Sequence, residues 1–489
     1  MPMSLPLSGV FSGLQPATVW AHFATLCRIP RASKNEAALR DELLAWARGR
    51  GLAVAVDAAG NLLVRKPATA GREHAPGVVL QAHLDMVCQK NSDSDHDFLR
   101  DPIEPVLDGG WLQAEKTTLG ADNGIGVALI LAVLESDDIE HGPLEALLTV
   151  DEEAGMGGAR GLASGLLQGK LMLNLDTEEW GEFYLGCAGG LDVNVERSGH
   201  AAGVPDGFQA WQLVLNGLRG GHSGVDIHEG RGNAIKLLVR VLRHLERDFP
   251  LRLAELKGGT ARNALPREAS ASFALPQGMG DALADAVGVV ETLLRNELRG
   301  IDDGLGLAVL PGKVSSVLAP DEQAIWLASL HAAPHGVRCM SRQVPGVVET
   351  SNNLGMVDLH PNGGSCNFMV RSLLDSGSTA LADEIVSLWE LSGTAATMDG
   401  YYPGWAPNPG SALLKTCQAV YKRDFAADST VQVIHAGLEC GIIGAKYPGL
   451  DIVSFGPTIR GAHAPGERLE VASVARCWQL LTAILAELR

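Results

Sequence analysis

Three apolar segments early in the chain each end in side chains that can bind a metal or move a proton. The segments and their polar residues are 78–87 with His83 and Asp85, 144–150 with the following Asp151, Glu152 and Glu153, and 170–175 with the following Asp176. Near-continuous apolar runs are typical of strands buried on both faces of a parallel sheet. Because open α/β sheets bind ligands at the carboxyl ends of their strands, the pattern predicts that these polar side chains lie together.

Apolar residues recur at the spacing of a helix between these segments and in other parts of the chain. The apolar positions predict helices at 36–50 and 122–135, and a hairpin around Gly60. Near the C-terminus the same alternation of helices and strands is predicted, with helices at 411–423 and 468–487 and two strands between them. Strands that alternate with helices predict an α/β domain whose mostly parallel sheet is flanked by helices.

A chain of 489 residues exceeds what one hydrophobic core usually organises. Between the two α/β regions the pattern changes to strands and long helices of an α+β type. We therefore expect a catalytic domain formed by 1–185 and 403–489, with a lid domain, 186–402, inserted into it. Within the insertion, 251–276 and 347–374 each predict two strands around an Asn-bearing turn, followed by a helix. This similarity favours a lid of two related halves.

Charge and composition exclude several classes of partner. The 39 Lys and Arg residues against 57 Asp and Glu residues give a net charge of −18, and aromatic residues make up 5% of the chain. Such a negative field repels phosphate backbones and anionic lipid surfaces, and few rings are available to stack on bases. We expect neither nucleic acid nor membrane as a partner.

Cysteine usage and the N-terminal segment favour a cytoplasmic protein. The closest two of the eight cysteines, Cys417 and Cys440, are 23 positions apart, so the sequence predicts neither a disulfide framework nor a thiolate zinc site. The first residues, MPMSLPLSGVFSGL, lack a basic region followed by a long apolar stretch. No run approaches the roughly 20 apolar residues of a membrane helix.

His83 and Asp85 admit two interpretations. Residues i and i+2 of a strand point to the same face, so the pair can be a buried His–Asp hydrogen bond with a purely structural role. Alternatively, His83 binds a metal while Asp85 holds the other ring nitrogen and fixes the tautomer.

The acidic residues that follow also admit both a structural and a functional interpretation when each is considered alone. Asp122, in GADNGIG before an apolar helix, can be an ordinary N-cap carboxylate, or it can bridge two cations where the glycines allow close backbone approach. The run Asp151-Glu152-Glu153 can be a solvated loop. Chemically, it also offers Glu153 as a ligand and Glu152 as the general base for a metal-activated water.

Asp176 and His463 by themselves resemble a turn acid and a surface histidine. Together with the residues above they complete a set of two histidines and three carboxylates: His83, Asp122, Glu153, Asp176 and His463. Nitrogen and oxygen ligands in this proportion suit Zn, Mn or Co better than Ca or Mg. A pair of metal ions about 3.5–4 Å apart, sharing one carboxylate, follows from this set.

The sequence resembles the bacterial aminoacyl-histidine (Xaa-His) dipeptidases, which belong to the larger family of di-zinc exopeptidases and deacylases. The similarity extends from Ile29 to the final helix. The motifs that carry it, in chain order, are VVLQAHLDMV, TTLGADNGIG, TVDEEAGM, LNLDTEE, GCAGG, GLRGGHSG, RNALPREA, YYPGW, HAGLECG and SFGPTIRGAHAP.

The resemblance implies a metal-dependent dipeptidase with two divalent ions, zinc first and cobalt or manganese as alternatives. It assigns His83 and Asp176 to one metal, Glu153 and His463 to the other, and Asp122 to both. In the same way it implies catalytic roles: Glu152 as the base, Asp85 as the support of His83, and His222 of the lid as the group that stabilises the oxyanion. For His222 the alternative is an exposed histidine in a Gly-rich turn.

Substrate contacts also follow from the resemblance. Asn263, Asn353 and Arg371 match lid positions that can meet a substrate carboxylate, although structural hydrogen bonds would explain them equally well. Two departures, at Gly466 and in Ser351–Leu354, bear on substrate preference. The expected substrates are dipeptides, including Xaa-His dipeptides such as β-Ala-His, and a homodimer is left open. The alternatives are an N-acyl amino acid deacylase and a catalytically silent metal-binding relative.

Overall fold

The computed structural model describes residues 9–489, so the first eight residues of the N-terminal segment considered above lie outside it. The chain forms two compact units. Unit 1 contains the residues up to 186 together with 407–433 and 438–489, and unit 2 contains 187–406 and 434–437. The sequence placed the corresponding changes at 185/186 and 402/403. Among residues 9–489, the helices are all too short or too polar to span a bilayer.

Unit 1 is built on an eight-stranded sheet. In the spatial order β1-β2-β6-β3-β7-β21-β8-β20, the strands are β1 (Ala53–Val56), β2 (Leu62–Lys66), β6 (Leu144–Thr149), β3 (Val78–His83), β7 (Leu171–Asn174), β21 (Asp451–Ser454), β8 (Glu182–Cys187) and β20 (Thr430–Ile434). The four central strands, β6, β3, β7 and β21, run parallel, and β2 and β8 pair antiparallel on either side of them. The predicted α/β fold with a largely parallel sheet is thus confirmed for the centre of the sheet.

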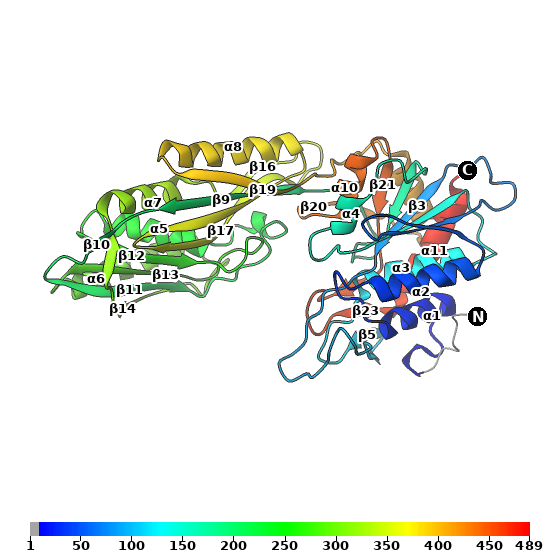
Figure 1. The fold of residues 1–489 in the computed structure, drawn as a ribbon, viewed down its shortest axis with the longest axis horizontal. Helices are drawn as coiled ribbons and strands as arrows, with labels where there is room; N and C mark the ends of the chain where they lie inside the picture. Colours follow the sequence, from blue (N-terminus) through cyan, green and yellow to red (C-terminus); the bar gives the residue numbers. More distant parts are fainter. Residues whose placement is uncertain (1–8) are drawn as a thin grey trace. The chain divides into compact units, whose positions relative to one another are not determined.

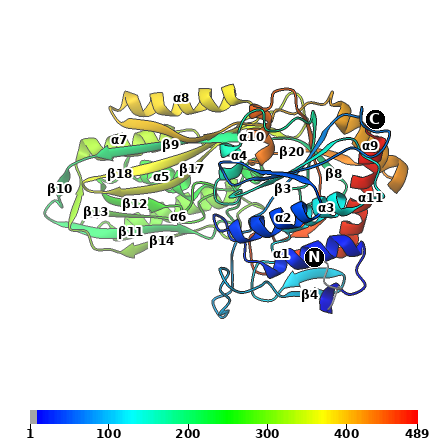
Figure 2. The ribbon, with the colours of Figure 1, turned by 45° about the vertical axis from the view of Figure 1, so that its right-hand side comes forward.

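Helices cover this sheet. They are α1 (Ala17–Arg28), α2 (Ala37–Gly49), α3 (Ala121–Glu135), α4 (Gly157–Gly161), α9 (Ala412–Phe425), α10 (Glu439–Lys446) and α11 (Val471–Glu487), after a short 3-10 turn, η1 (Gly9–Phe11). Helix α3 packs against both α1 and β3, with α11 beside it (Figures 1 and 2). Nearly every side chain of α3 is buried, which is why its sequence has no polar face.

A small second sheet completes unit 1. Its order is β22 (Ile459–Arg460), β23 (Arg468–Glu470), β5 (Trp111–Ala114) and β4 (Pro105–Asp108). Pairing of β23 with β5 joins the C-terminal region to the segment before α3. The loop between β22 and β23 contains His463.

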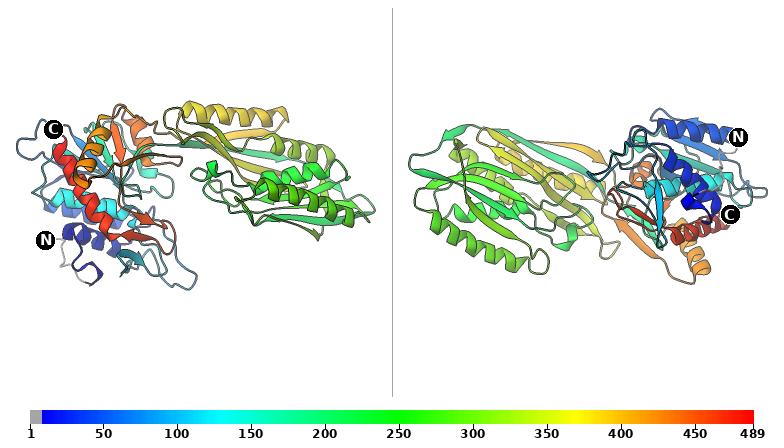
Figure 3. Two further views of the ribbon diagram at one scale, coloured as in Figure 1. Left: turned by 180° about the vertical axis from the view of Figure 1, so that it is seen from behind. Right: turned by 90° about the horizontal axis from the view of Figure 1, so that it is seen from below.

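Unit 2 is a nine-stranded antiparallel sheet with helices on one face (Figure 3). In the order β14-β11-β13-β12-β17-β18-β9-β19, the strands are β14 (Gly306–Pro311), β11 (Phe208–Asn216), β13 (Ala269–Pro276), β12 (Arg252–Gly258), β17 (Val348–His360), β18 (Gly363–Ser372), β9 (Gly189–Ser198) and β19 (Ala395–Tyr402), with β16 (Gly336–Met340) also paired to β17. The helices are α5 (Ala234–Leu245), α6 (Gly280–Glu297), α7 (Pro320–Ala332) and α8 (Asp375–Leu391), with a 3-10 turn, η2 (Ile227–Glu229). A separate ribbon pairs β10 (Ala201–Gly203) with β15 (Ser316–Leu318).

The same order of elements occurs twice within unit 2. One series is β11, α5, β12, β13, α6 and β14, and the other is β9, α7, β17, β18, α8 and β19. In the sheet the two series are mirrored about the antiparallel pair β12–β17. Their helices and inward-facing strand residues share one hydrophobic core, which includes Trp326, Trp389 and Phe368.

Candidate metal centre

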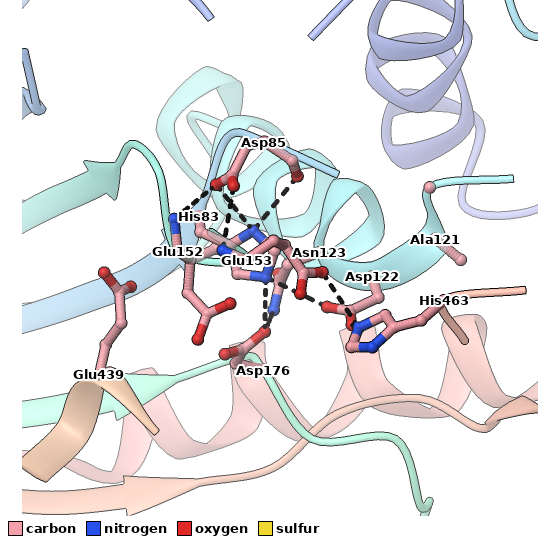
Figure 4. Close-up of polar contacts among 12 residues, drawn as sticks. His83, Asp85, Ala121, Asp122, Asn123, Glu152, Glu153, Asp176, Glu439 and His463 are labelled. Atoms are coloured by element: carbon pink, nitrogen blue, oxygen red, sulfur yellow. Dashed lines mark hydrogen bonds and ion pairs between the residues drawn. The ribbon is translucent and has the colours of Figure 1, made fainter. Parts of the chain in front are cut away.

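Five of the predicted side chains meet in unit 1 at the carboxyl end of its parallel strands (Figure 4). One group of ligand atoms comes from His83, Asp122 and Asp176, and a second comes from Asp122, Glu153 and His463. Within each group the atoms lie within 4.8 Å of one another, and His83, Glu152 and Glu153 form a third group by the same measure. The two-histidine, three-carboxylate set expected from the sequence is therefore assembled in space.

Asp122 lies at the centre of the cluster. Its Oδ1 is 3.1 Å from Nε2 of His83, and its Oδ2 is 3.0 Å from Nε2 of His463. The same two nitrogens each contact a second carboxylate: Oδ1 of Asp176 is 3.2 Å from His83 Nε2, and Oε1 of Glu153 is 3.1 Å from His463 Nε2. One carboxylate is thus shared between two imidazoles, each of which faces a second carboxylate.

The start of α3 explains how Asp122 reaches this position. The N-cap residue is Gly120, in the left-handed region at φ 70°, which has no side chain of its own to cap the helix. Asp122 and Asn123 have non-helical backbone angles and are joined by a cis peptide bond. The Asp122 side chain therefore contacts the histidines and is not an N-cap, which was the simpler interpretation of its sequence.

Asp85 connects His83 to the acidic loop after β6. Strand β3 ends at His83, so Asp85 is not an i+2 partner on a strand as the sequence suggested. Its Oδ1 still lies 3.4 Å from His83 Nδ1, and its carboxylate accepts hydrogen bonds from Ser33 Oγ at 2.8 Å and from the amides of Glu152 and Glu153 at 3.0 and 3.1 Å. Burial opposes the charge, but the contact with His83 lowers the pKa of Asp85 to about 2.

Glu152 is a buried carboxyl group beside the cluster. Burial raises its pKa well above the usual range, and the nearby charges of Asp176 and Glu153 add to this effect against the opposing influence of His83. A carboxylate whose pKa is raised by burial holds a proton more tightly than an exposed one, as a general base must.

The residues of the cluster fit divalent cations. Three carboxylates and two imidazoles supply the oxygen and nitrogen atoms that Zn, Mn and Co bind. Burial raises the pKa of both Glu153 and Asp176, since an anionic cluster is costly without a compensating cation. Among the described residues, the buried Oε1 of Glu153 has no donor in hydrogen-bonding geometry, which leaves a lone pair for a metal.

The remaining predicted residues belong to unit 2. His222 is half-buried, and its Nδ1 accepts hydrogen bonds from the amides of Gly224 and Val225 at 3.2 and 3.0 Å. Burial, assisted by the charge of Arg371, lowers the pKa of His222 to about 4. The ring is therefore neutral near pH 7 and carries its proton on Nε2, as a hydrogen-bond donor would.

The other three residues differ in their surroundings. Asn353 is buried in β17, and its amide donates to the carbonyl oxygens of Arg262 and Ala264 at 3.0 and 2.9 Å. These bonds hold the loop that contains the exposed Asn263. Arg371 is buried in β18 and donates from Nη1 to the hydroxyl of Tyr402 at 2.8 Å.

Comparison with known proteins identifies the relatives of this chain. Residues 214–302, in unit 2, match the M20 family model described as a peptidase dimerisation domain. The chain is 45% identical over 478 residues to the cytosol non-specific dipeptidase of Escherichia coli strain K12, with 98% of this chain and 99% of the relative aligned. The chain belongs to the cytosol non-specific dipeptidase family of M20 peptidases.

Solved structures agree with this assignment. The aminoacylhistidine dipeptidase of Vibrio alginolyticus matches with a TM-score of 0.89 and 45% identity over 98% of both chains. An aminopeptidase from Bacillus cereus, at 16% identity and a TM-score of 0.56 over 97% of this chain and 99% of its own, shares the fold alone. The family resemblance and the fold class predicted from the sequence are confirmed, and this M20 family member is a peptidase, a hydrolase of peptide bonds.

Three buried residues around the centre were not predicted from the sequence. Glu439 accepts hydrogen bonds from Gln81 Nε2 and Thr149 Oγ1, both at 2.6 Å, and burial raises its pKa to about 7. Glu467 and Arg31 contact the backbone at the start of α3. The motif containing Glu439 and the loop containing Glu467 were recognised, but an isolated acid or base in a loop gives no periodic signal of its partners.

Proposed function

We propose that this chain is a metal-dependent dipeptidase that hydrolyses Xaa-His dipeptides, such as β-Ala-His, and other dipeptides. The observation that carries the proposal is the Asp122 carboxylate shared between His83 and His463, with Asp176 and Glu153 beside them. The names of the two 45%-identical relatives support the substrate class.

The metals are two divalent ions, zinc in the first place and cobalt or manganese as alternatives. His83 and Asp176 would hold one ion, Glu153 and His463 the other, and Asp122 both. When bound, such ions act as Lewis acids that polarise a carbonyl oxygen and make a water more acidic. Asp85 fixes the ring of His83 through Nδ1, so that Nε2 faces the shared carboxylate.

Glu152 is the proposed general base. Its carboxylate takes a proton from the water that attacks the peptide carbonyl carbon. The same carboxyl group returns this proton to the nitrogen of the leaving amine when the peptide bond breaks. The raised pKa of Glu152 supports this role, since it makes the carboxylate a stronger base than an exposed one.

The roles implied for unit 2 remain predictions. His222 would donate its Nε2 hydrogen to the oxyanion, and Asn263, Asn353 and Arg371 would bind the substrate carboxylate. For His222, the neutral ring with Nδ1 occupied by two backbone amides supports a donor role. For Asn353, both hydrogen bonds that its amide donates go to backbone oxygens, which favours a structural role.

The proposed oligomeric state and cellular location rest on the relatives. The match to a peptidase dimerisation domain supports a homodimer, and the word cytosol in the name of the Escherichia coli relative supports a cytoplasmic location. The net charge of −18 is consistent with small peptides as ligands and with no nucleic acid partner.

The decisive experiment is hydrolysis by purified protein that has been stripped with a chelator and then supplied with Zn, Mn or Co. β-Ala-His, Gly-His and Leu-Gly are the substrates, and an N-acetyl amino acid is the comparison. We expect cleavage of the dipeptides only after a metal is restored. Preferential cleavage of the N-acetyl compound would indicate a deacylase, and two bound metals without any turnover would indicate a silent binding protein.

A further inference from the structure

The carboxylate of Glu467 accepts hydrogen bonds from four consecutive backbone amides. Oε2 accepts from Leu119 N and Gly120 N at 2.8 and 2.9 Å, and Oε1 accepts from Ala121 N and Asp122 N at 2.7 and 3.2 Å. The first amides of a helix have no acceptor within the helix, and here the non-helical Asp122 lengthens the irregular segment. One side chain, only 2% exposed, satisfies them all.

Arg31 binds a carbonyl oxygen of the same turn. This buried guanidinium donates to the carbonyl oxygen of Gly120, and also to those of Leu84 and Asp85 at 3.0 and 2.9 Å. The backbone that presents Asp122 is therefore fixed between an anion on its amides and a cation on its carbonyl. The two charges lie within one buried region, so each lowers the cost of burying the other.

Glu467 also fixes the loop that carries His463. The His463 side chain is 52% exposed, and its backbone is in the left-handed region at φ 66°. Glycines with positive φ, Gly461 and Gly466, flank it in the loop. Packing against His463 itself therefore gives this loop little support. Glu467, four positions after His463, is buried, and its amide closes the turn by donating to Ala464 O at 3.1 Å.

We infer that Glu467 is a positioning residue for the metal centre. Its carboxylate fixes the backbone at Asp122 and the loop of His463, so that the two side chains stay in contact. This inference rests on the proposed function. Two of the three residues in the group Asp122, Glu153 and His463 depend on this carboxylate. In the group His83, Asp122 and Asp176, His83 is the last residue of β3 and Asp176 follows β7, so these two depend on the sheet instead.

This asymmetry gives a specific expectation. Loss of the Glu467 contacts weakens the metal held by Glu153 and His463 more than the metal held by His83 and Asp176. Residues that orient metal ligands typically contribute about 10–100-fold to metal affinity or activity, and we expect a loss of this size for one equivalent only.

The test is Glu467→Gln in the full-length protein. The amide retains one acceptor oxygen but turns an NH₂ group toward two backbone N–H donors. Zinc is titrated into chelator-stripped protein in competition with a chromophoric chelator, and circular dichroism monitors the fold. Glu470→Gln, three residues along and half-exposed, is the control, because Glu470 forms an ion pair with Arg476 at 3.0 Å and contacts no ligand of the centre.

We expect two zinc equivalents in the wild type and in the control. In Glu467→Gln, one equivalent binds about 10–100-fold more weakly and the other, which shares Asp122, is weakened less, with kcat recovering at high zinc concentration. Unchanged binding of both equivalents, or equal weakening of both, overturns the inference. Fewer than two equivalents in the wild type would overturn the proposed function and the inference with it.

A second variant covers a failure of the first to fold. Glu467→Asp keeps the charge but shortens the reach by one methylene, and it should show the same selective loss. If neither variant folds, Glu467 serves the fold as a whole and the inference is wrong.

Discussion

Oδ2 of Asp122 lies 3.0 Å from Nε2 of His463, although 341 residues separate them along the chain. The other oxygen of the same carboxylate contacts His83, at 3.1 Å. The cluster therefore depends on the C-terminal loop returning to the start of α3. A residue in that loop can affect the centre as strongly as one on the central strands.

Replacement of Glu152 by Gln tests the proposed base. The amide cannot accept the proton of the attacking water, so we expect kcat to fall by about 10²–10⁴-fold. Metal content should remain at two equivalents, because Glu152 is not one of the proposed ligands. Metal analysis and steady-state kinetics measure the two effects, with Glu140→Gln, an exposed carboxylate with 67% of its side chain accessible, as the control. Retained turnover would remove Glu152 from the mechanism.

Asp85→Asn tests the support of His83. The amide places an NH₂ group where the carboxylate now accepts from Ser33 and from the amides of Glu152 and Glu153. At least one of these donors then faces another donor, and both the His83 ring and the acidic loop shift. We expect a loss of about 10–100-fold in zinc affinity or kcat/KM. Asp93→Asn, at an exposed ion pair with Lys116, should match the wild type. A fully active Asp85→Asn protein would show that Asp85 has no positioning role.

Gly456→Ala tests the entry to the His463 loop. A Cβ at Gly456 would lie 1.9 Å from the carbonyl oxygen of Thr177, next to Asp176. Backbone on both sides must move, so we expect a loss of about 1–3 kcal/mol in the free energy of unfolding of unit 1. Gly49→Ala in α2 is the control, because a Cβ there meets no atom within 4 Å. Calorimetry compares the two, and equal stability would mean that the loop adjusts without cost.

His435 gives unit 2 a pH-dependent stability. Its Nε2 bonds to Ser351 Oγ at 2.7 Å, and burial, with the charges of Arg371 and His222, lowers its pKa from 6.5 to about 3. Between these values the unfolded chain binds a proton that the folded chain does not. Protonation of His435 therefore costs the folded protein nothing above pH 6.5. As the pH falls from 6.5 toward 3, the free energy of unfolding decreases, and at pH 5 it is lower by about 2 kcal/mol.

The variant His435→Gln removes this titration while it retains a polar partner for Ser351. Urea unfolding at pH 7.5 and pH 5 should show a pH dependence smaller than that of the wild type by about 2 kcal/mol. Other titrating groups contribute equally to both proteins and cancel in the comparison. Parallel pH profiles would contradict the assignment of this dependence to His435.

Much of unit 1 could be predicted because buried strands leave a strong sequence signal. Apolar runs before His83, Glu152 and Asp176 are needed wherever a strand is covered on both faces, and side chains after parallel strands share one edge of the sheet. The direction of β2 and β8 was not predicted, because antiparallel and parallel edge strands bury similar side chains.

The sequence by itself determined the strands, the helices and the residue types that could bind a metal, since local periodicity and strand ends are properties of short segments. Tertiary structure alone decided which of them meet. In the sequence His463 looks like any loop histidine, and only the structure shows that its ring faces Asp122. Glu467 likewise looks like any loop acid, and only the structure shows that it accepts from four backbone amides. Such contacts join residues more than 300 positions apart, and their energy depends on burial and geometry that exist only once the chain has folded.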